Sequence, residues 1–354
     1  MSILRFFKNV LNLLIVGVLL TGCFSNNNVS SEDTKEFDGV INIYSDRHYP
    51  IDDTIYKRFE NTFNIKVNLV KGKSEDLLSR IEKEGDATKA DLLITADVGR
   101  LHQAKAAGLF QPIEYPEGID KVSNYLYDEE GYWYGITKRA RIIVYDPKKV
   151  KKNDLDTYEG LADPKWNGQI AVRSKGNIYN QSLLASIISA NGEEVALEWV
   201  KGVVNNMARP PKGNDRDQVK FVYAGKANLA IVNTYYLGKM LFSDDPVERV
   251  AASNMELFFP NQKGRGTHIN ISGVGVLKAS DNVKASSKLI AYLLTPEIQE
   301  LYAQANFEFP VVKGVALHET VESWGSFKED TVKLNTIGEN NTLAIKLFDK
   351  GGWK

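Results

Sequence analysis

The chain has 354 residues, with 44 Lys and Arg against 45 Asp and Glu, 43% hydrophobic residues and one cysteine. At about 100–200 residues per domain, this length predicts about two domains. The hydrophobic fraction excludes a disordered chain, and the near-neutral charge argues against a nucleic-acid-binding protein. A single cysteine excludes an internal disulfide, a cysteine-rich zinc site and a CxxC redox pair. A metal site would therefore use oxygen or imidazole ligands, and the chain offers 16 tyrosines against four histidines.

The first 22 residues have the pattern of a signal peptide. Arg5 and Lys8 precede an apolar run, Val10–Leu20, that is shorter than the roughly 20 residues of a membrane-spanning helix. The run leads into LTGC at residues 20–23, which resembles the lipobox of bacterial lipoproteins. We expect Cys23 to be lipidated and residues 23–37 to form a flexible tether, which places an exported protein in the periplasm or cell envelope. The alternative is a chance cleavage site with a free cysteine.

From Gly39 onward, short apolar strands alternate with amphipathic helices. The first predicted strands are Val40–Tyr44, Ile65–Val70 and Asp91–Thr95. The helices between and after them are one with Ile51, Ile55 and Phe59 on one face, one capped by Ser74, and Arg100–Ala107, which ends at Gly108. This order predicts a mostly parallel sheet covered by helices.

The rest of the chain continues the alternation. Predicted strands are Ile142–Tyr145, Gln169–Val172, Ala227–Val232 and Glu256–Phe259, with an apolar segment at Ile271–Leu277. Predicted helices are Gln181–Ala190, Glu193–Val204, Asp217–Ala224, Val283–Leu294 and one from Pro296 to about Ala305. A chain that leaves one α/β lobe, builds a second and then returns to the first would explain this order. Two facing lobes would form a ligand cleft at the carboxyl ends of their strands.

Tyrosines follow three of the predicted strands. The first strand leads into His48 and Tyr49, a strand of the second lobe leads into Tyr179, and another leads into Tyr235 and Tyr236. Taken singly, each tyrosine is most simply a packing residue. Their shared position after strands favours a joint role.

A cluster of phenolates favours a hard, highly charged cation. Phenol has a reference pKa of about 10, so it becomes a ligand only when a strong Lewis acid displaces its proton. Zn²⁺ and Cu²⁺ more often bind His or Cys, and Ca²⁺ and Mg²⁺ bind carboxylates. The pattern therefore points to Fe³⁺, with Fe²⁺ as a further candidate. Four phenolates around Fe³⁺ leave one negative charge, for which the nearby candidate partners are Arg47, Arg139, Arg141 and Lys239.

Four segments resemble the ferric-ion-binding proteins of bacterial iron ABC transporters, and the Tyr-rich members found in cyanobacteria are the most similar. The segments are YSDRHYPID at 44–52, ITKRARIIVYDPKKV at 136–150, ARPPKGNDRDQVKFVYAGKANLAIVNTYYLGK at 208–239 and TPEIQELYAQANFEFPV at 295–311. The resemblance implies an α/β type II periplasmic-binding-protein fold, similar to transferrin, with two lobes joined by hinge strands around a cleft. We expect residues 38–137 and about 265–310 in lobe 1, and residues 138–264 and about 311–354 in lobe 2.

The resemblance also implies a ligand set. Tyr235 and Tyr236 match the family's adjacent ligand pair, Tyr179 matches an additional ligand of the Tyr-rich members, and Tyr49 matches their ligand from the first lobe. Some family members use a His from the same loop, so His48 is either a ligand or a neighbour of the site. Adjacent residues usually point in different directions, which favours Tyr49 as the ligand. Arg139 matches a basic residue that the family uses for an accompanying anion or for charge compensation.

The expected function is that of a non-catalytic receptor that captures Fe³⁺ between its lobes and delivers it to a membrane permease. We expect a monomer, with a synergistic anion or water completing the coordination. One alternative is a binding protein for another small solute, such as a polyamine, thiamine or an organic anion. A metal-dependent hydrolase would need a His or carboxylate cluster, and the sequence contains no HExxH, GxSxG or P-loop motif.

Overall fold

The computed structural model describes residues 38–354. The predicted signal peptide, the lipidation site at Cys23 and the predicted tether lie outside these described residues.

The strands form one continuous mixed sheet with the order β2-β1-β3-β8-β4-β6-β5, and β7 pairs with β4. β1 pairs in parallel with β2 and β3, as predicted, and β8 adds to this set in the antiparallel direction. The segment that returns late in the chain thus joins the sheet built first. The strands are β1 (Gly39–Ser45), β2 (Ile65–Lys71), β3 (Leu92–Thr95), β4 (Tyr134–Tyr145), β5 (Ile170–Ala171), β6 (Leu229–Asn233), β7 (Glu256–Phe258) and β8 (Ile269–Val276).

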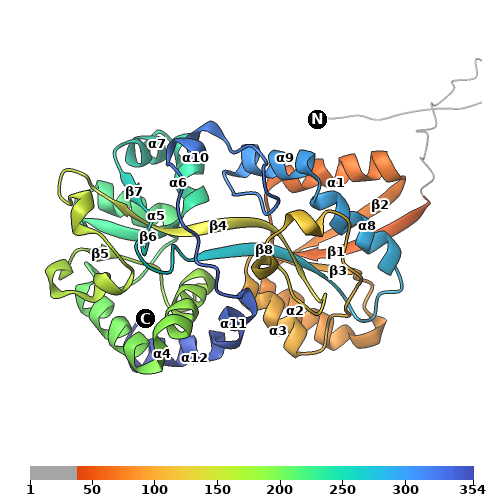
Figure 1. The fold of residues 1–354 in the computed structure, drawn as a ribbon, viewed down its shortest axis with the longest axis horizontal. Helices are drawn as coiled ribbons and strands as arrows, with labels where there is room; N and C mark the ends of the chain where they lie inside the picture. Colours follow the sequence, from red (N-terminus) through yellow and green to blue (C-terminus); the bar gives the residue numbers. More distant parts are fainter. Residues whose placement is uncertain (1–37) are drawn as a thin grey trace, which may run out of the picture. The chain divides into compact units, whose positions relative to one another are not determined.

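Helices pack on both sides of the sheet in two groups, which we name the first and second lobes (Figure 1). The first lobe contains β1–β3 with α1 (Pro50–Phe63), α2 (Ser74–Glu84), α3 (Val98–Ala106), α8 (Val283–Leu293) and α9 (Pro296–Asn306). The second contains β5–β7 with α4 (Ile178–Asn206), α5 (Asp215–Tyr223), α6 (Thr234–Leu241), α7 (Pro246–Ser253) and α12 (Asn341–Lys350). The remaining helices are α10 (Glu319–Ser323) and α11 (Leu334–Glu339). Strands β4 and β8 lie side by side where the lobes meet.

Strand β4 differs most from the prediction, because it begins at Tyr134 and not at Ile142. Its first part pairs with β8 and its end pairs with β6, so it passes from one lobe to the other. Arg139 and Arg141 are buried within it, beside the carboxylates of Asp97 and Asp215. The sequence pattern does not show the first part of the strand because its buried charges hide the apolar pattern, and their partners are distant in the sequence.

Two predicted helix starts are corrected by the structure. Ser74 is the first residue of α2 and not its N-cap, and its hydroxyl donates to the carboxylate of Asp46. Helix α3 begins at Val98, before the predicted Arg100, and the Asp97 side chain caps it by accepting from the Gly99 amide at 2.7 Å. Both differences bring a side chain of the first lobe towards the sheet edge where the strands end.

The tyrosine pair lies in α6, a helix that the sequence pattern does not predict after the strand. Helix α6 packs closely on Phe307, at the end of α9, because Gly238 has no side chain. A Cβ at Gly238 would come within 2.5 Å of the Phe307 ring. This close packing fixes the position of the helix turn that carries Tyr235 and Tyr236.

We expect Gly238→Ala to lower the free energy of unfolding by about 1–3 kcal/mol, because the methyl group overpacks the contact with Phe307. The loss should occur although alanine favours a helix over glycine by about 1 kcal/mol. Urea unfolding of the apo-protein measures it. Gly264→Ala is the control, because its nearest atom would lie at 3.8 Å. Equal stability of the two variants would contradict the packing argument.

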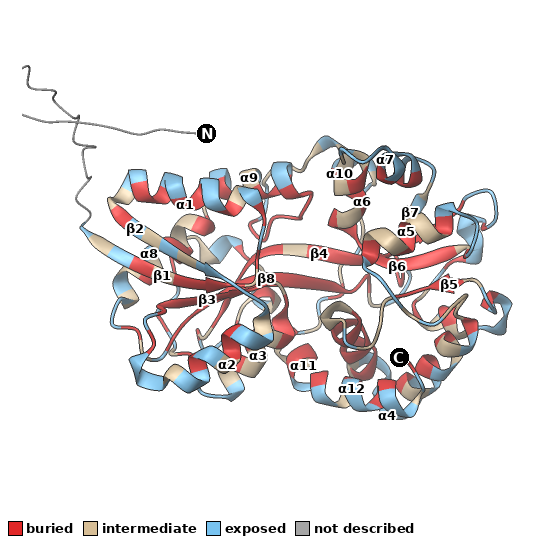
Figure 2. Cartoon of the chain, turned by 180° about the vertical axis from the view of Figure 1, so that it is seen from behind, coloured by how far each residue is buried: buried red, intermediate tan, exposed pale blue. Residues whose placement is uncertain are grey.

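The buried residues follow the sheet and the helix faces that cover it, whereas the outer helix faces are exposed (Figure 2). The end of the chain is part of this core: Trp353 is 2% exposed and its ring centroid lies 6.0 Å from that of Trp199. The indole nitrogen of Trp353 donates to the carbonyl of Arg173 at 2.9 Å. The C-terminus therefore supports the loop that leads into α4.

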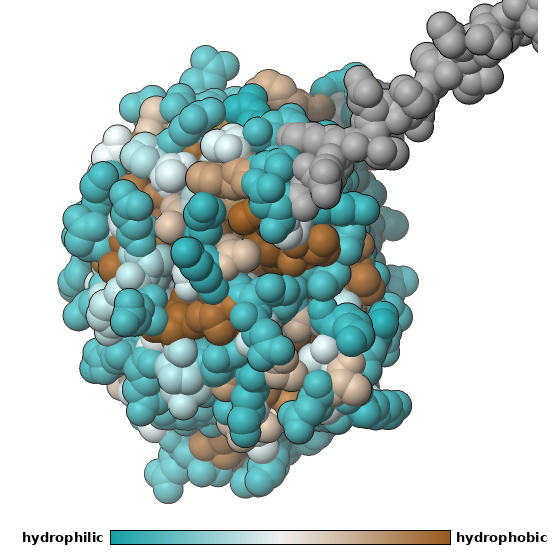
Figure 3. All heavy atoms as spheres, turned by 90° about the vertical axis from the view of Figure 1, so that its right-hand side faces the viewer, coloured by the Kyte–Doolittle hydropathy of each residue, from teal (hydrophilic) through white to brown (hydrophobic). Residues whose placement is uncertain are grey.

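Figure 3 shows the face of the molecule at the first-lobe end, where hydrophilic residues surround small hydrophobic patches. Such scattered apolar surface is usual for a water-exposed domain. Within residues 38–354, no helix has the length and apolar character needed to cross a bilayer.

Candidate functional site

The four predicted tyrosines come together at the start of three helices. Tyr49 is the N-cap of α1, Tyr179 lies in the first turn of α4, and Tyr235 and Tyr236 lie in the first turn of α6. The Tyr235 hydroxyl donates to that of Tyr179 at 3.3 Å. The Tyr235 ring centroid lies 6.2 Å from that of Tyr49 and 4.3 Å from that of Tyr236. Both lobes thus contribute phenols to one cluster, which we call the tyrosine cluster.

The helix starts place the phenols in a field that favours negative charge. The first amides of a helix have no partners within the helix, and the helix dipole adds positive potential there. Pro50 directs Tyr49 into the cluster, because a residue before proline is held extended, here at φ −86° and ψ 136°. The helix starts therefore offset part of the cost of forming phenolates at a buried site.

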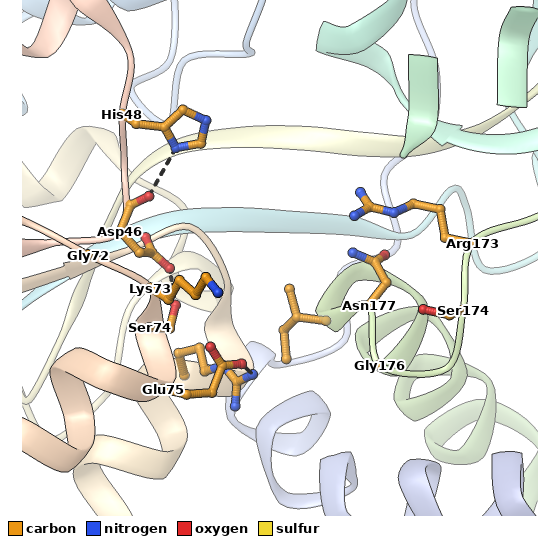
Figure 4. Close-up of a pocket in the computed structure, with 12 residues that line it drawn as sticks. Asp46, His48, Gly72, Lys73, Ser74, Glu75, Arg173, Ser174, Gly176 and Asn177 are labelled. Carbon is orange, nitrogen blue, oxygen red and sulfur yellow. Dashed lines mark hydrogen bonds and ion pairs between the residues drawn. The ribbon is translucent and has the colours of Figure 1, made fainter. Parts of the chain in front are cut away.

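His48 and Tyr49 differ in burial, although their ring centroids lie only 5.4 Å apart. Tyr49 is 8% exposed, whereas His48 is exposed and its Nδ1 lies 3.2 Å from the carbonyl oxygen of Asp46. Figure 4 shows this contact and places His48 at the wall of a pocket. The geometry favours Tyr49 over His48 as the side chain that enters the cluster.

Burial keeps the phenols of Tyr49, Tyr179 and Tyr235 protonated when no cation is bound. Burial, with the nearby carboxylate of Glu308 as the next contribution, raises the pKa of Tyr49 well above its ordinary value. The pKa values of Tyr179 and Tyr235 are likewise raised, first by burial and then by neighbouring phenols of the cluster. A cation that binds here must therefore displace protons, which selects for high charge.

Three cationic side chains lie against the cluster. The Arg47 guanidinium carbon lies 4.7 Å from the Tyr49 ring centroid, and the Arg139 carbon lies 5.3 Å from that of Tyr179. The Lys239 ammonium lies 3.8 Å from the Tyr49 centroid, and burial lowers its pKa to about 8. Arg47 is itself paired with Asp52 at 3.2 Å and Glu308 at 3.3 Å. Arg139 has a more distant carboxylate, that of Asp97 at 3.9 Å, so Arg139 and Lys239 are better placed than Arg47 to offset new negative charge.

Arg141 supports the tyrosine cluster through hydrogen bonds to residues next to its helix starts. Its guanidinium donates to Asp215 at 2.6 Å, to Asn233 at 3.1 Å and to Asn180 at 2.7 Å. Asn180 follows Tyr179, and Asn233 immediately precedes α6. Arg141 thus fixes the two helix starts of the second lobe through their neighbours.

Three charged neighbours of the site were not singled out from the sequence. Arg173 lies 5.9 Å from the Tyr179 ring centroid and is paired with Asp215 at 2.7 Å. Its position directly after a strand was a usable signal. Glu308 and Asp215 gave none, since each is an isolated carboxylate far along the chain from the residues that it meets.

A pocket of about 390 Å³ opens beside the cluster (Figure 4). Asp46, His48 and Lys73 line it from the first lobe, and Arg173 and Asn177 face them from the second. His48 and Ile178, which both line it, precede Tyr49 and Tyr179 in the sequence. The pocket therefore borders the segments that carry two of the tyrosines, although none of the four tyrosines lines it.

The other three histidines have different surroundings. His268 is buried, and burial together with Arg265 lowers its pKa well below the ordinary value. His318 caps α10, where its Nδ1 accepts from the Thr320 amide at 3.1 Å. His102 packs against Gly338 of α11. In the described part of the chain, no three His, Cys, Asp or Glu side chains are grouped as a metal site would require.

Comparison with known proteins gives consistent matches. Residues 87–329 match the family model described as bacterial extracellular solute-binding protein. The chain is 46% identical over 336 residues to iron uptake protein A1 of Synechocystis sp., which covers 95% of this chain and 93% of that protein.

Two solved structures share the fold. The FutA (IdiA) protein of Trichodesmium, solved in complex with iron and citrate, has a TM-score of 0.86 and 45% identity, and the match covers 89% of this chain and 100% of that one. A ferric binding protein from Campylobacter jejuni has a TM-score of 0.84 and 41% identity, with coverage of 89% and 100%. The expected two-lobed periplasmic-binding-protein fold is thus confirmed. With the family model and the 46% identical relative in agreement, the chain belongs to the bacterial extracellular solute-binding proteins, in the group that contains the ferric-iron-binding proteins.

Proposed function

We propose that this chain is the substrate-binding protein of an iron(III) ABC importer, which captures Fe³⁺ through Tyr49, Tyr179, Tyr235 and Tyr236 and delivers it to a permease. The observation that carries the proposal is the meeting of four phenols from both lobes at three helix starts. The names of the relatives, an iron uptake protein and a ferric binding protein, support the same cargo. The role is that of a receptor and not of an enzyme.

The chemistry of the donors favours Fe³⁺ over other cations. Hard, anionic oxygens suit a small trivalent ion, and such an ion can displace the protons that burial holds on the phenols. Fe³⁺ with four phenolates has a net charge of −1, which Arg139 and Lys239 offset at the edge of the cluster. Fe²⁺ would leave a charge of −2, so its binding is weaker and reduction favours release.

The remaining coordination position is open to water or to a small anion. The FutA protein of Trichodesmium was solved with citrate as well as iron, which supports a small anion in this position. His48, at the wall of this pocket, stays outside the first coordination sphere in this proposal.

Lobe closure couples the ligands to one cation. We assign residues 38–137 and about 265–310 to lobe 1, and residues 138–264 and about 311–354 to lobe 2, with β4 and β8 as hinge strands. Tyr49 comes from the first and the other three phenols from the second, so a cation that binds all four favours the closed form.

The mature protein acts as a monomer in the cell envelope. Its proposed anchor is a lipid on Cys23, and the family of extracellular solute-binding proteins supports export. We expect mass spectrometry of the N-terminal peptide, isolated from cells, to show a chain that begins at a diacylated Cys23. A peptide with an unmodified Cys23 would contradict the anchor and leave the iron site untouched.

Titration of the purified apo-protein with ferric citrate tests the proposed function. Phenolate ligands to Fe³⁺ produce a visible charge-transfer band, which should grow to saturation at one iron per chain. Gallium(III) citrate is the control, since Ga³⁺ occupies the same kind of site without this band and should block its appearance. Absence of the band, or purification with a tightly bound organic solute in place of iron, would contradict the proposal.

A further inference from the structure

A buried carboxylate joins the two lobes beside the tyrosine cluster. Asp97, before α3 of the first lobe, is 1% exposed. Its Oδ1 accepts from the Gly99 amide at 2.7 Å and from the Ser182 hydroxyl at 2.8 Å. Its Oδ2 accepts from the Asn270 side chain at 2.8 Å and lies 3.9 Å from an Arg139 nitrogen.

These contacts divide by lobe. Gly99 belongs to the same helix as the Asp97 cap, and Asn270 lies on β8, which pairs directly with β3. Ser182 lies on α4, in the second lobe, so its bond crosses the interface between the lobes. An N-cap requires only the Gly99 contact. The bond to Ser182 is therefore additional to what α3 needs.

Ser182 is placed to act on the iron ligand Tyr179. The two residues are three apart on α4, so they lie on neighbouring positions of one helix face, separated by about one turn. The Asp97 bond holds this turn against the first lobe, which also supplies Tyr49. The distance between phenols of the two lobes thus depends on this contact.

We propose that the hydrogen bond between Ser182 and Asp97 is a closure contact, in which Ser182 is a positioning residue that slows the release of iron. The inference rests on the proposed function. When the lobes separate, Asp97 keeps Gly99 and Asn270, and it keeps Arg139 because Arg139 is paired with Asn270 where β4 runs beside β8. It loses Ser182, so the bond to Ser182 stabilises the closed form. A hydrogen bond to a charged group has enough energy to change an equilibrium by about 10- to 100-fold.

The test compares iron release from wild type, Ser182→Ala and Ser186→Ala. Iron is loaded first, and release to an excess of a strong chelator is followed as decay of the charge-transfer band. We expect Ser182→Ala to release iron about tenfold or more faster than wild type, with an unchanged band maximum because the four phenols remain. Ser186→Ala should release at the wild-type rate. Ser186 is buried on the same helix, and its hydroxyl donates to the Leu183 carbonyl at 2.7 Å and accepts from Arg265 at 3.5 Å, so it has no bond to Asp97 to lose.

A conservative variant separates positioning from a general loss of stability. Ser182→Thr keeps the hydroxyl and should restore slow release, whereas apo-protein melting temperatures of Ser182→Ala and Ser186→Ala should agree. A Ser182→Ala rate within twofold of wild type, or equally fast release from Ser182→Thr, would overturn the closure contact. These results would leave the proposed function intact, because that fails only if wild type itself forms no band.

Discussion

The double substitution Tyr235→Phe, Tyr236→Phe is expected to remove most of the charge-transfer band that appears on addition of ferric citrate. It removes two of four phenolates and keeps both rings, so the packing of α6 is preserved. We expect affinity for Fe³⁺ to fall by more than about 100-fold, since the loss of an outer-sphere partner alone costs a metal site 10- to 100-fold. Absorbance titration and competition with a chelator of known affinity measure the two effects.

The matched control for the tyrosine pair is Tyr223→Phe. Tyr223 is 42% exposed on α5, so loss of its hydroxyl should leave both the band and the affinity unchanged. The apo double variant should unfold within about 1 kcal/mol of wild type, because it loses one hydrogen bond, from Tyr235 to Tyr179. A double variant that keeps the wild-type band would rule out this pair as ligands.

Substitution of Asp215 has the largest expected effect on stability. Its carboxylate is fully buried and is paired with Arg141 at 2.6 Å and Arg173 at 2.7 Å. It also accepts from the Asn233 amide at 3.2 Å, directly before α6. Asp215→Ala leaves Arg141 buried without its charge partner, which typically costs 3–5 kcal/mol, and we expect a loss of about that size in urea unfolding.

The same substitution should weaken iron binding, because Arg141 and Asn233 position the helix starts that carry Tyr179 and Tyr235. Asp217→Ala is the control on the same helix. Asp217 is half-buried and accepts only from local groups at the start of α5, so its loss should cost about 1 kcal/mol. Equal losses for Asp215→Ala and Asp217→Ala would show that the buried pairing does not stabilise the second lobe.

The apolar pattern was sufficient to predict most of the sheet and its helices. Strands β1, β2 and β6 lie within about a residue or two of their predicted bounds, and the interruption of α4 falls at Gly192, between the two predicted helices. The spacing of apolar side chains shows which face of a helix or strand is buried, and this spacing can be seen within a short stretch of sequence. The predicted start of β4 was wrong, because buried arginines in a sequence look like surface residues until their partners are known.

The placement of tyrosines after strands was also readable in advance, since strands of an α/β sheet deliver their following loops to a common edge. The charged residues that surround the tyrosine cluster could not be predicted from the sequence. Glu308 reaches Arg47 from the far end of the chain, and Asp97 meets Ser182 across the two lobes. No spacing rule connects such residues, because their contact depends on the crossing of β4 and β8.

The sequence by itself thus determined the order of elements, the exported character of the chain and the phenolic chemistry of its candidate site. Only the tertiary structure decided that Tyr49 is turned inward while His48 lies at the surface, that Arg139 and Lys239 lie against the phenols, and that Asp97 joins the lobes. The physical reason is that the alternation of apolar and polar residues, which shows the buried face of a helix or strand, can be followed within a short stretch of the sequence. The pairing of buried charges depends on the topology of the chain, which brings carboxylates and cations from distant segments together. Each of these charges would be costly to bury without its partner.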